Sequence, residues 1–100
     1  MLLFKVYFGG LFMWTDAQIK GKILHKLTRK GKFEHSHTAL ENLAKSFSPE
    51  MKGRAKEMSE DLIREGILHL KKASYGKQVS INLENEGRIM EYIDEFLKME

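Results

Sequence analysis

Hydrophobic residues three or four positions apart predict amphipathic helices near both ends of the chain. The first is predicted over residues 16–29, after a capping box formed by Thr15 and Gln18. Its apolar face consists of four aliphatic residues, Ile19, Ile23, Leu24 and Leu27. Gly31 is placed to end it. The last helix is predicted to begin near Asn85 and to carry apolar residues along one side.

Two further helices are predicted in the middle of the chain. Thr38 and Glu41 have the spacing of a second capping box, and the short helix after them buries three apolar residues, Leu40, Leu43 and Ala44. Ser48 and Pro49 predict the next helix start, because a hydroxyl that can cap a helix precedes a proline at the first helical position. This helix is predicted over residues 49–65, with Gly66 as its terminator. Its inward stripe consists of Met51, Ala55, Met58 and Leu62.

Alternating apolar and polar residues predict a β-hairpin after Gly66. Its strands cover residues 67–72 and 77–83, and residues 73–76 form the turn. Upstream, residues 32–35 form a short extended segment that is predicted to be a small strand. The predicted fold class is α+β and mostly helical, with a three-helix core, the hairpin and a C-terminal helix. A chain of 100 residues allows one such domain, predicted over residues 15–83, and residues 84–100 form the helix used for packing or dimerisation.

The first 14 residues form an apolar extension in which 11 positions are hydrophobic. This stretch is too short to span a bilayer as a helix. It also lacks the basic leader and the small-residue cleavage site of a signal peptide, and no membrane partner is expected. Three interpretations remain open: an arm or strand that covers a core or a partner subunit, an anchor on a membrane surface, and a mis-assigned start with Met13 as the first native residue.

Charge is divided unevenly along the chain. Residues 1–83 hold 15 Lys and Arg against 8 Asp and Glu, a net charge of +7, whereas residues 84–100 hold 2 against 6, a net charge of −4. A basic body with an acidic last helix is typical of a nucleic-acid-binding protein whose last helix points away from the phosphates. Two solvated faces of unlike sign are the other interpretation. The absence of cysteine excludes disulfides and thiolate chemistry and fits a cytoplasmic protein.

No residue pattern in the chain predicts catalysis. Neither a serine nor a carboxylate lies in a recognisable catalytic frame, and no glycine-rich phosphate loop is present, so neither an enzyme nor a cofactor is predicted. His35 and His37 would lie on the same side of an extended segment, which is half of a metal site. Neither a cysteine nor a carboxylate pair completes that site, and no metal is predicted.

The order of these pieces resembles the winged helix-turn-helix regulators of the MarR and PadR type and the small archaeal winged-helix proteins. The resemblance rests on Leu43-Ala44, on the core triplet Ala55, Met58 and Leu62, on Gly66-Ile67-Leu68, and on the ending Ile81-Asn82-Leu83-Glu84-Asn85-Glu86-Gly87-Arg88. It covers residues 15–98. It implies a sequence-specific transcription regulator that binds double-stranded DNA as a homodimer.

In such a protein the helix over residues 49–65 enters the major groove with its N-terminal turns, and the hairpin wing lies on the DNA backbone. Nine residues are predicted to contact DNA: Ser48, Lys52, Gly53, Arg54, Lys56, Lys72, Ser74, Tyr75 and Lys77. Glu60 and Asp61 are predicted to lie away from the phosphates. The alternative is a solvated amphipathic helix beside a hairpin whose lysines only guard an exposed strand edge.

The last helix carries more apolar surface than a small core needs. Its predicted dimerisation residues are Ile89, Met90, Ile93, Phe96 and Leu97. The DNA-binding helices of the two subunits would then contact half-sites roughly 34 Å apart. A monomer whose two ends both pack on the core is the alternative. The alternative function is a winged-helix protein-interaction module in a larger complex without specific DNA binding, which Glu57, Glu60 and Asp61 favour.

Overall fold

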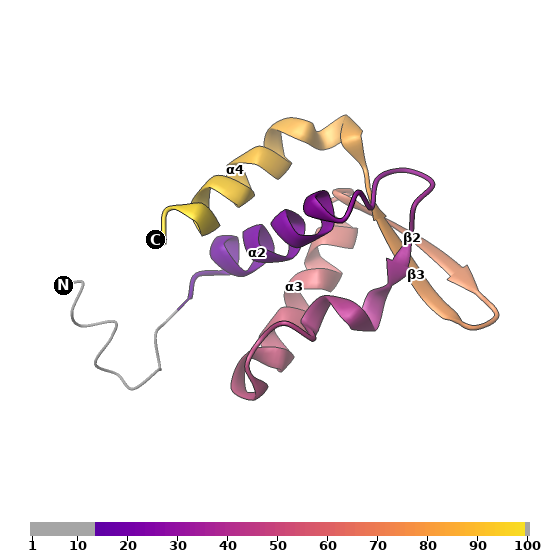
Figure 1. Ribbon diagram of the computed structural model, residues 1–100, viewed down its shortest axis with the longest axis horizontal. Helices are drawn as coiled ribbons and strands as arrows, with labels where there is room; N and C mark the ends of the chain where they lie inside the picture. The colour runs from indigo at the N-terminus through magenta and orange to yellow at the C-terminus, as the bar shows by residue number, and fades with distance from the viewer. Residues whose placement is uncertain (1–13, 100) are drawn as a thin grey trace.

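Within residues 14–99 of the computed structural model, three α-helices pack together and a small antiparallel sheet lies beside them (Figure 1). The helices are α2 (Asp16–Arg29), α3 (Lys52–Arg64) and α4 (Glu86–Leu97). The structure describes residues 14–99, so the predicted apolar extension up to Met13 lies outside the described residues. The α+β, mostly helical fold class predicted from the sequence is confirmed.

Helix α2 has the predicted start and the predicted buried face. The backbone N–H of Gln18 donates to Thr15 Oγ1 at 3.1 Å, and the backbone N–H of Thr15 donates to Gln18 Oε1 at 2.9 Å, which completes the capping box. All four aliphatic residues of the predicted face are buried: Ile19, Ile23, Leu24 and Leu27. Gly31 follows the helix with a φ of 66°, a backbone conformation that favours glycine.

The segment after α2 differs from the prediction. Thr38 does not cap a helix, because it lies in strand β1 (Thr38–Ala39), where it pairs with Val79. Its Oγ1 accepts a hydrogen bond from Asn42 Nδ2 at 3.3 Å. The helix that follows, η1 (Leu40–Ala44), is a 3₁₀ helix without a side-chain cap. It buries Leu43, as predicted, whereas Leu40 and Ala44 are only half-buried.

The small strand predicted over residues 32–35 is reduced to a single bridge. Phe33 pairs in parallel with Ile81, and the backbone N–H of Ile81 donates to the carbonyl of Lys32 at 2.8 Å. The chain then turns at Glu34, whose φ is 46°. The predicted extended segment is thus confirmed only at Phe33, and the strand of this region, β1, lies a few residues later.

Helix α3 is preceded by one turn of 3₁₀ helix, η2 (Pro49–Met51), with proline at its start as predicted. Ser48 makes no side-chain cap; its carbonyl accepts the backbone N–H of Met51 at 2.9 Å. The predicted stripe of α3 faces the core, with Ala55, Met58 and Leu62 buried and Met51 half-buried. Gly66 ends the helix region with a φ of 76°.

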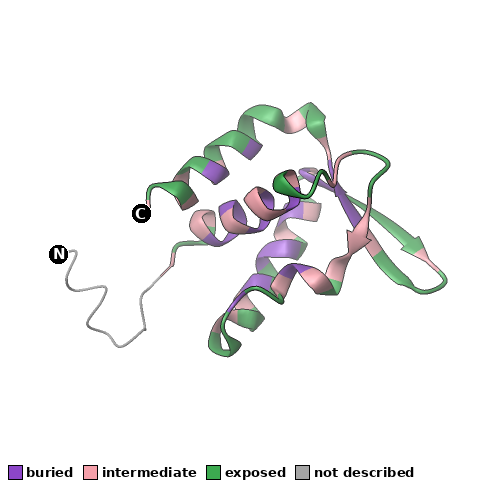
Figure 2. Ribbon diagram, viewed as in Figure 1, coloured by how far each residue is buried: buried purple, intermediate pink, exposed green. Residues whose placement is uncertain are grey.

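The predicted hairpin is confirmed with a shorter second strand. Strands β2 (Leu68–Ala73) and β3 (Gly76–Ile81) pair antiparallel, with Leu68 opposite Ile81 and Ala73 opposite Gly76. The sheet order is β1-β3-β2, so β3 is central. Leu83, predicted to end the second strand, instead begins a 3₁₀ turn, η3 (Leu83–Asn85). The hairpin tip lies in solvent, while the base of β3 is buried (Figure 2).

At Gly21, helices α2 and α4 approach each other too closely for a side chain to fit between them. A β-carbon built on Gly21 would lie 2.0 Å from the carbonyl oxygen of Tyr92 and 2.8 Å from Phe96 Cβ. Ile89 and Ile93 of α4 are buried in the same core as the aliphatic face of α2. The missing side chain at Gly21 therefore permits a backbone contact between the two helices.

Candidate nucleic-acid interface

An open groove of about 570 Å³ lies between α3, η1 and the hairpin tip. It brings together four of the nine residues predicted to contact DNA: Lys52 and Lys56 from α3, and Tyr75 and Lys77 from the hairpin. The groove is completed by Ala39, Leu40, Glu41, Ala44, Ser59, Glu60 and Gly76. Two elements that are distant in sequence thus present cations and a phenol to one concave surface.

The folding of α3 explains why its lysines face the groove. Ala55, Met58 and Leu62 hold one side of α3 in the core. Lys52 and Lys56 are four residues apart, so they lie one above the other on the exposed side. Because the core anchors the opposite face, the helix presents these two ammonium groups in a fixed direction.

The tip of the hairpin brings the remaining groups. Tyr75 is 78% exposed, the most exposed of the large hydrophobic side chains in the described chain. Gly76 adopts a φ of 126°, so the turn depends on a residue without a side chain. The phenol is held above the groove by a tight turn rather than by packing.

The other five predicted DNA-binding residues do not line the groove: Ser48, Gly53, Arg54, Lys72 and Ser74. Four of them are exposed, and a β-carbon built on Gly53 would meet no atom within 4 Å, so the surface of α3 is open there. Ser74 lies in the turn and Lys72 on β2. The four exposed residues stay candidates for contact with DNA outside the groove.

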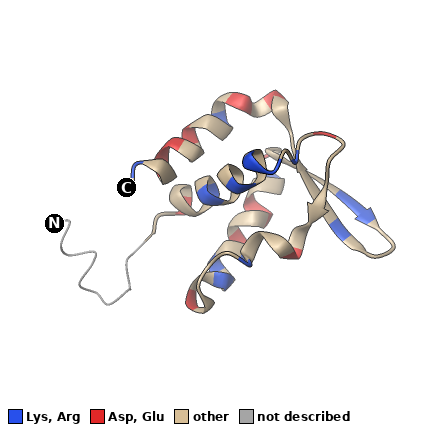
Figure 3. Cartoon of the chain, viewed as in Figure 1, with Lys and Arg blue, Asp and Glu red and all other residues tan. Residues whose placement is uncertain are grey.

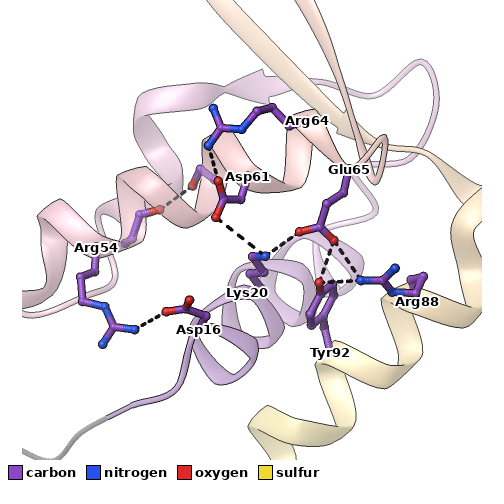
Figure 4. A network of polar contacts seen from close by, with 10 residues as sticks. Asp16, Lys20, Arg54, Asp61, Arg64, Glu65, Arg88 and Tyr92 are labelled. Carbon is purple, nitrogen blue, oxygen red and sulfur yellow. Dashed lines mark hydrogen bonds and ion pairs between the residues drawn. The ribbon is translucent and has the colours of Figure 1, made fainter.

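Arg54 points toward the start of α2 instead of solvent (Figure 4). Its Nη1 donates to the carbonyl oxygen of Trp14 at 2.9 Å, and its Nη2 lies 2.5 Å from Asp16 Oδ1. From its position in the sequence alone, Arg54 was predicted to lie at the edge of the DNA-facing side of α3. In the folded chain the guanidinium instead ties α3 to α2.

Acidic residues are also part of the groove. Glu41 and Glu60 line it beside the lysines. Glu60, predicted to lie away from the phosphates, thus shares the groove with Lys52 and Lys56. Asp61 does point elsewhere: it pairs with Arg64, and its Oδ2 lies 3.9 Å from Lys20 Nζ. The groove therefore combines three lysines with two carboxylates.

The charges are segregated over the fold as the sequence predicted for its two parts. Lys and Arg gather on α2, on the start of α3 and on the hairpin, whereas Asp and Glu predominate on α4 (Figure 3). Lys52, Lys56, Lys71, Lys72 and Lys77 make no ion pair within residues 14–99. Their charge is therefore available to an anionic partner.

A polar cluster joins the three helices behind this surface (Figure 4). Glu65, at the end of α3, lies 2.5 Å from Lys20 Nζ of α2 through Oε2. Its Oε1 accepts hydrogen bonds from the hydroxyl of Tyr92 at 2.7 Å and from Arg88 Nη2 at 3.1 Å, both on α4. No local sequence pattern indicates this cluster, because its members come from three separate helices.

The pKa values of this cluster reflect the pairing. Burial opposes the charged form of Lys20, but its hydrogen bond and attraction to Glu65 prevail and raise its pKa. Burial likewise opposes the charge of Glu65, but the hydrogen bonds from Lys20 and Tyr92 lower its pKa below the ordinary value. Both groups are therefore charged at neutral pH.

The predicted dimerisation residues of α4 are divided between core and surface. Ile89 and Ile93 are buried within the chain, and Phe96 is half-buried and stacks on Trp14 with a centroid distance of 6.2 Å. Met90 is 50% exposed and Leu97 is 44% exposed. Met90 and Leu97 are thus the exposed large hydrophobic residues of α4.

The remaining candidates add no further chemistry to the described residues. His37 Nδ1 lies 3.1 Å from the carbonyl oxygen of His35, and no group of three His, Asp or Glu within residues 14–99 could hold a metal ion. None of the helices in that range has the length and hydrophobicity needed to cross a membrane.

Neither a protein-family model, nor a curated protein, nor a solved structure matches the chain. The function therefore has to be inferred from the residues and contacts described above.

Proposed function

We propose that the protein is a winged-helix transcription regulator that binds double-stranded DNA. In this proposal α3 enters the major groove, which is wide enough for a helix, and the β2–β3 hairpin lies as a wing on the adjacent backbone. The observation that carries the proposal is the shared groove, where Lys52 and Lys56 of α3 face Tyr75 and Lys77 of the hairpin.

The order of the elements supports this proposal. Helix α2 precedes β1, η1 and α3, and the hairpin follows, with the sheet order β1-β3-β2. This arrangement is compatible with a winged helix in which η1 and α3 form the helix-turn-helix. The acidic helix α4 packs on α2, so the carboxylates of α4 lie away from α3, the helix proposed to enter the major groove.

Each group in the proposed interface has a distinct role. Lys52, Lys56 and Lys77 neutralise phosphates, and such contacts position a protein on DNA without reading sequence. Ser59 is buried and donates its hydroxyl to the carbonyl of Ala55, so it does not contribute to base reading. Tyr75 contacts the sugar-phosphate backbone from the wing, where its phenol can donate a hydrogen bond.

The active form in this proposal is a homodimer that pairs through α4. Met90 and Leu97 are seven residues apart, so they lie on one face of the helix, and both are exposed. Sedimentation of the wild type against Leu97→Glu tests this part. A dimer that becomes a monomer in the variant supports α4 pairing, and an unchanged molecular mass contradicts it.

A protein-interaction module is the second candidate function. The observation that favours it is the pair of carboxylates, Glu41 and Glu60, among the lysines of the groove. A mixed surface with an exposed tyrosine suits a polar protein partner, since tyrosine is enriched at protein interfaces. Weak duplex binding with little dependence on salt would favour this function over the first.

The deciding experiment is a salt titration of duplex DNA binding by the wild type and by Lys52→Ala/Lys56→Ala. Each phosphate contact adds roughly 0.9 to the slope of log K against log salt, so the proposed dimer, which loses two contacts per chain, should show a slope flattened by roughly 3.6. Affinity should also fall at every salt concentration. Fluorescence anisotropy with a labelled random duplex measures both quantities.

A charge-matched control variant is Lys45→Ala/Lys98→Ala. Lys45 is exposed on the loop after η1, and Lys98 lies beyond α4 and pairs only with Glu95 at 3.5 Å. This variant loses the same net charge but should retain most of the wild-type slope. If both variants flatten the slope equally, binding is diffuse attraction to a basic protein, and the proposed interface is wrong.

A further inference from the structure

A second basic surface lies along α2, on residues that the groove does not use. An open cleft of about 430 Å³ is lined there by Lys22, His25, Lys26, Arg29, Lys30, Ser46 and Phe96, and we refer to it as the α2 cleft. Four of these seven residues are Lys or Arg, and no Asp or Glu lines the cleft. It shares no residue with the groove between α3 and the hairpin.

The cations of the α2 cleft form a continuous row. Lys22, Lys26 and Lys30 are spaced four residues apart, and Arg29 lies beside the last of them. At a rise of 1.5 Å per residue, the row from Lys22 to Lys30 is roughly 12 Å long. The buried aliphatic residues of α2 hold the helix from its other side, so the row faces outward.

Aromatic rings form an apolar base for this row. Phe96 lies 5.6 Å from the ring of His25, centroid to centroid. Lys22 Nζ lies 4.7 Å from the centroid of Phe47 and donates a hydrogen bond to the carbonyl oxygen of Ser46 at 3.2 Å. Walls of low dielectric constant concentrate the field of like charges in a cleft, which strengthens its attraction for an anion.

The row has no acidic partner within residues 14–99. Every ion pair there involves Lys20, Arg54, Arg64, Arg88 or Lys98, none of which lines the α2 cleft. Burial and, after it, the neighbouring charge of Lys26 lower the pKa of Lys22.

Lys20 provides the comparison on the same helix. It is more buried than Lys22, but Glu65 lies 2.5 Å away, and its pKa is raised. Within the described residues, a carboxylate thus pairs with one partly buried lysine of α2, Lys20, and with Lys22 none does. The negative end of the helix dipole stabilises the charges of Lys26 and Arg29, because both lie in the last turn of α2. Lys22 lies in the middle of the helix, where the dipole gives no such stabilisation.

We propose that the α2 cleft binds clustered phosphate groups, from either a small polyphosphate or the backbone of a nucleic acid. A row of four cations suits several adjacent phosphates better than a single carboxylate. Arg29 can bind phosphate oxygens in a bidentate manner, and the lysines act as point charges along the chain of phosphates. The site is independent of DNA binding by α3 and the hairpin.

Calorimetric titration of the full chain with inorganic tripolyphosphate at physiological salt is the first test. The variant Lys26→Gln/Arg29→Gln should bind at least about tenfold more weakly, because two charge-assisted contacts are lost. Lys71→Gln/Lys72→Gln removes the same charge from the exposed hairpin strand and should bind as tightly as the wild type. Circular dichroism establishes that both variants are folded.

A second arm distinguishes the source of the phosphates. Lys52→Ala/Lys56→Ala weakens the proposed α3 interface, and the residual duplex binding is then measured with and without Lys26→Gln/Arg29→Gln. Selective loss of tripolyphosphate binding supports the α2 cleft as a site for small polyphosphates, and selective loss of residual duplex binding supports a nucleic-acid backbone. If neither probe depends on the α2 pair more than on the hairpin pair, the proposal is wrong. Tripolyphosphate binding is readable even if α3 does not bind DNA, so the two proposals fail separately.

Discussion

Gly21→Ala is the substitution that most directly tests the packing of α4 on α2. The new methyl carbon would lie 2.0 Å from the carbonyl oxygen of Tyr92, which is backbone and has no rotamer to change. To reach an ordinary contact distance of 3.4 Å, the oxygen has to retreat by about 1.4 Å. Helix α4 must therefore move as a body, or part from α2.

The expected cost follows from the two ways in which the structure can respond. A shift of α4 costs about 3 kcal/mol as overpacking, and the better helix propensity of alanine returns about 1 kcal/mol. Detachment of α4 would instead expose Ile89 and Ile93, at about 1.5 to 3 kcal/mol each. We expect a net destabilisation of about 2 kcal/mol, because the chain adopts the less costly response.

Urea unfolding followed by circular dichroism measures this change. With a slope of about 1.5 kcal/mol/M, the midpoint should fall by roughly 1.3 M. Gly87→Ala is the matched control, since a β-carbon there meets no atom within 4 Å and the residue lies in α4 itself. It should be neutral or raise stability by about 0.5 kcal/mol. A Gly21→Ala protein as stable as the wild type would refute the close approach of the two helices.

Two further predictions concern single polar side chains. Ser80 is fully buried, and its Oγ has no hydrogen-bond partner in the described part of the chain. Ser80→Ala should therefore raise the free energy of unfolding, measured with urea, by about 1 kcal/mol. A decrease of that size would show that the hydroxyl has a hydrogen-bond partner. Glu65 has a folded-state pKa below its ordinary value near 4.5, so its contribution to stability is present above pH 4.5 and is lost as the pH falls through the lower, folded pKa. Glu65→Gln should therefore be less stable than the wild type at pH 7 and should lose less stability than the wild type on acidification, and parallel pH profiles would contradict the pairing with Lys20.

Local sequence signals predicted the elements whose stability is local. The capping box of Thr15 and Gln18 and the aliphatic spacing of α2 need no distant partner, and both were confirmed. Thr38 carries a similar capping signal, yet β3 takes its backbone into the sheet. Pairing with a strand about forty residues away outweighs a cap of about 1 kcal/mol. Local helix propensity cannot reveal this competition between a helix cap and pairing with a distant strand.

The candidate sites show the same limit. Periodicity alone placed Lys56 on the exposed face of α3 and Lys52 on its flank, and both line the groove. Arg54 could not, because Asp16 reaches it across 38 residues of sequence. Lys20 reads as a solvated helix residue until Glu65, 45 residues away, is in place. The glycine within α2 was the one available signal for close helix packing, since an interior glycine weakens a helix unless packing requires it.

The carboxylate of Glu65 has a consequence for how motion would pass through the molecule. It ends α3, holds the ammonium of α2 with one oxygen and accepts two donors of α4 with the other. A twist of α4 about its own axis would carry Arg88 and Tyr92 away from that oxygen, so α4 and α3 turn together or these bonds break. Because the core holds α3 in place, a partner that rotates α4 would have to break both bonds to Glu65.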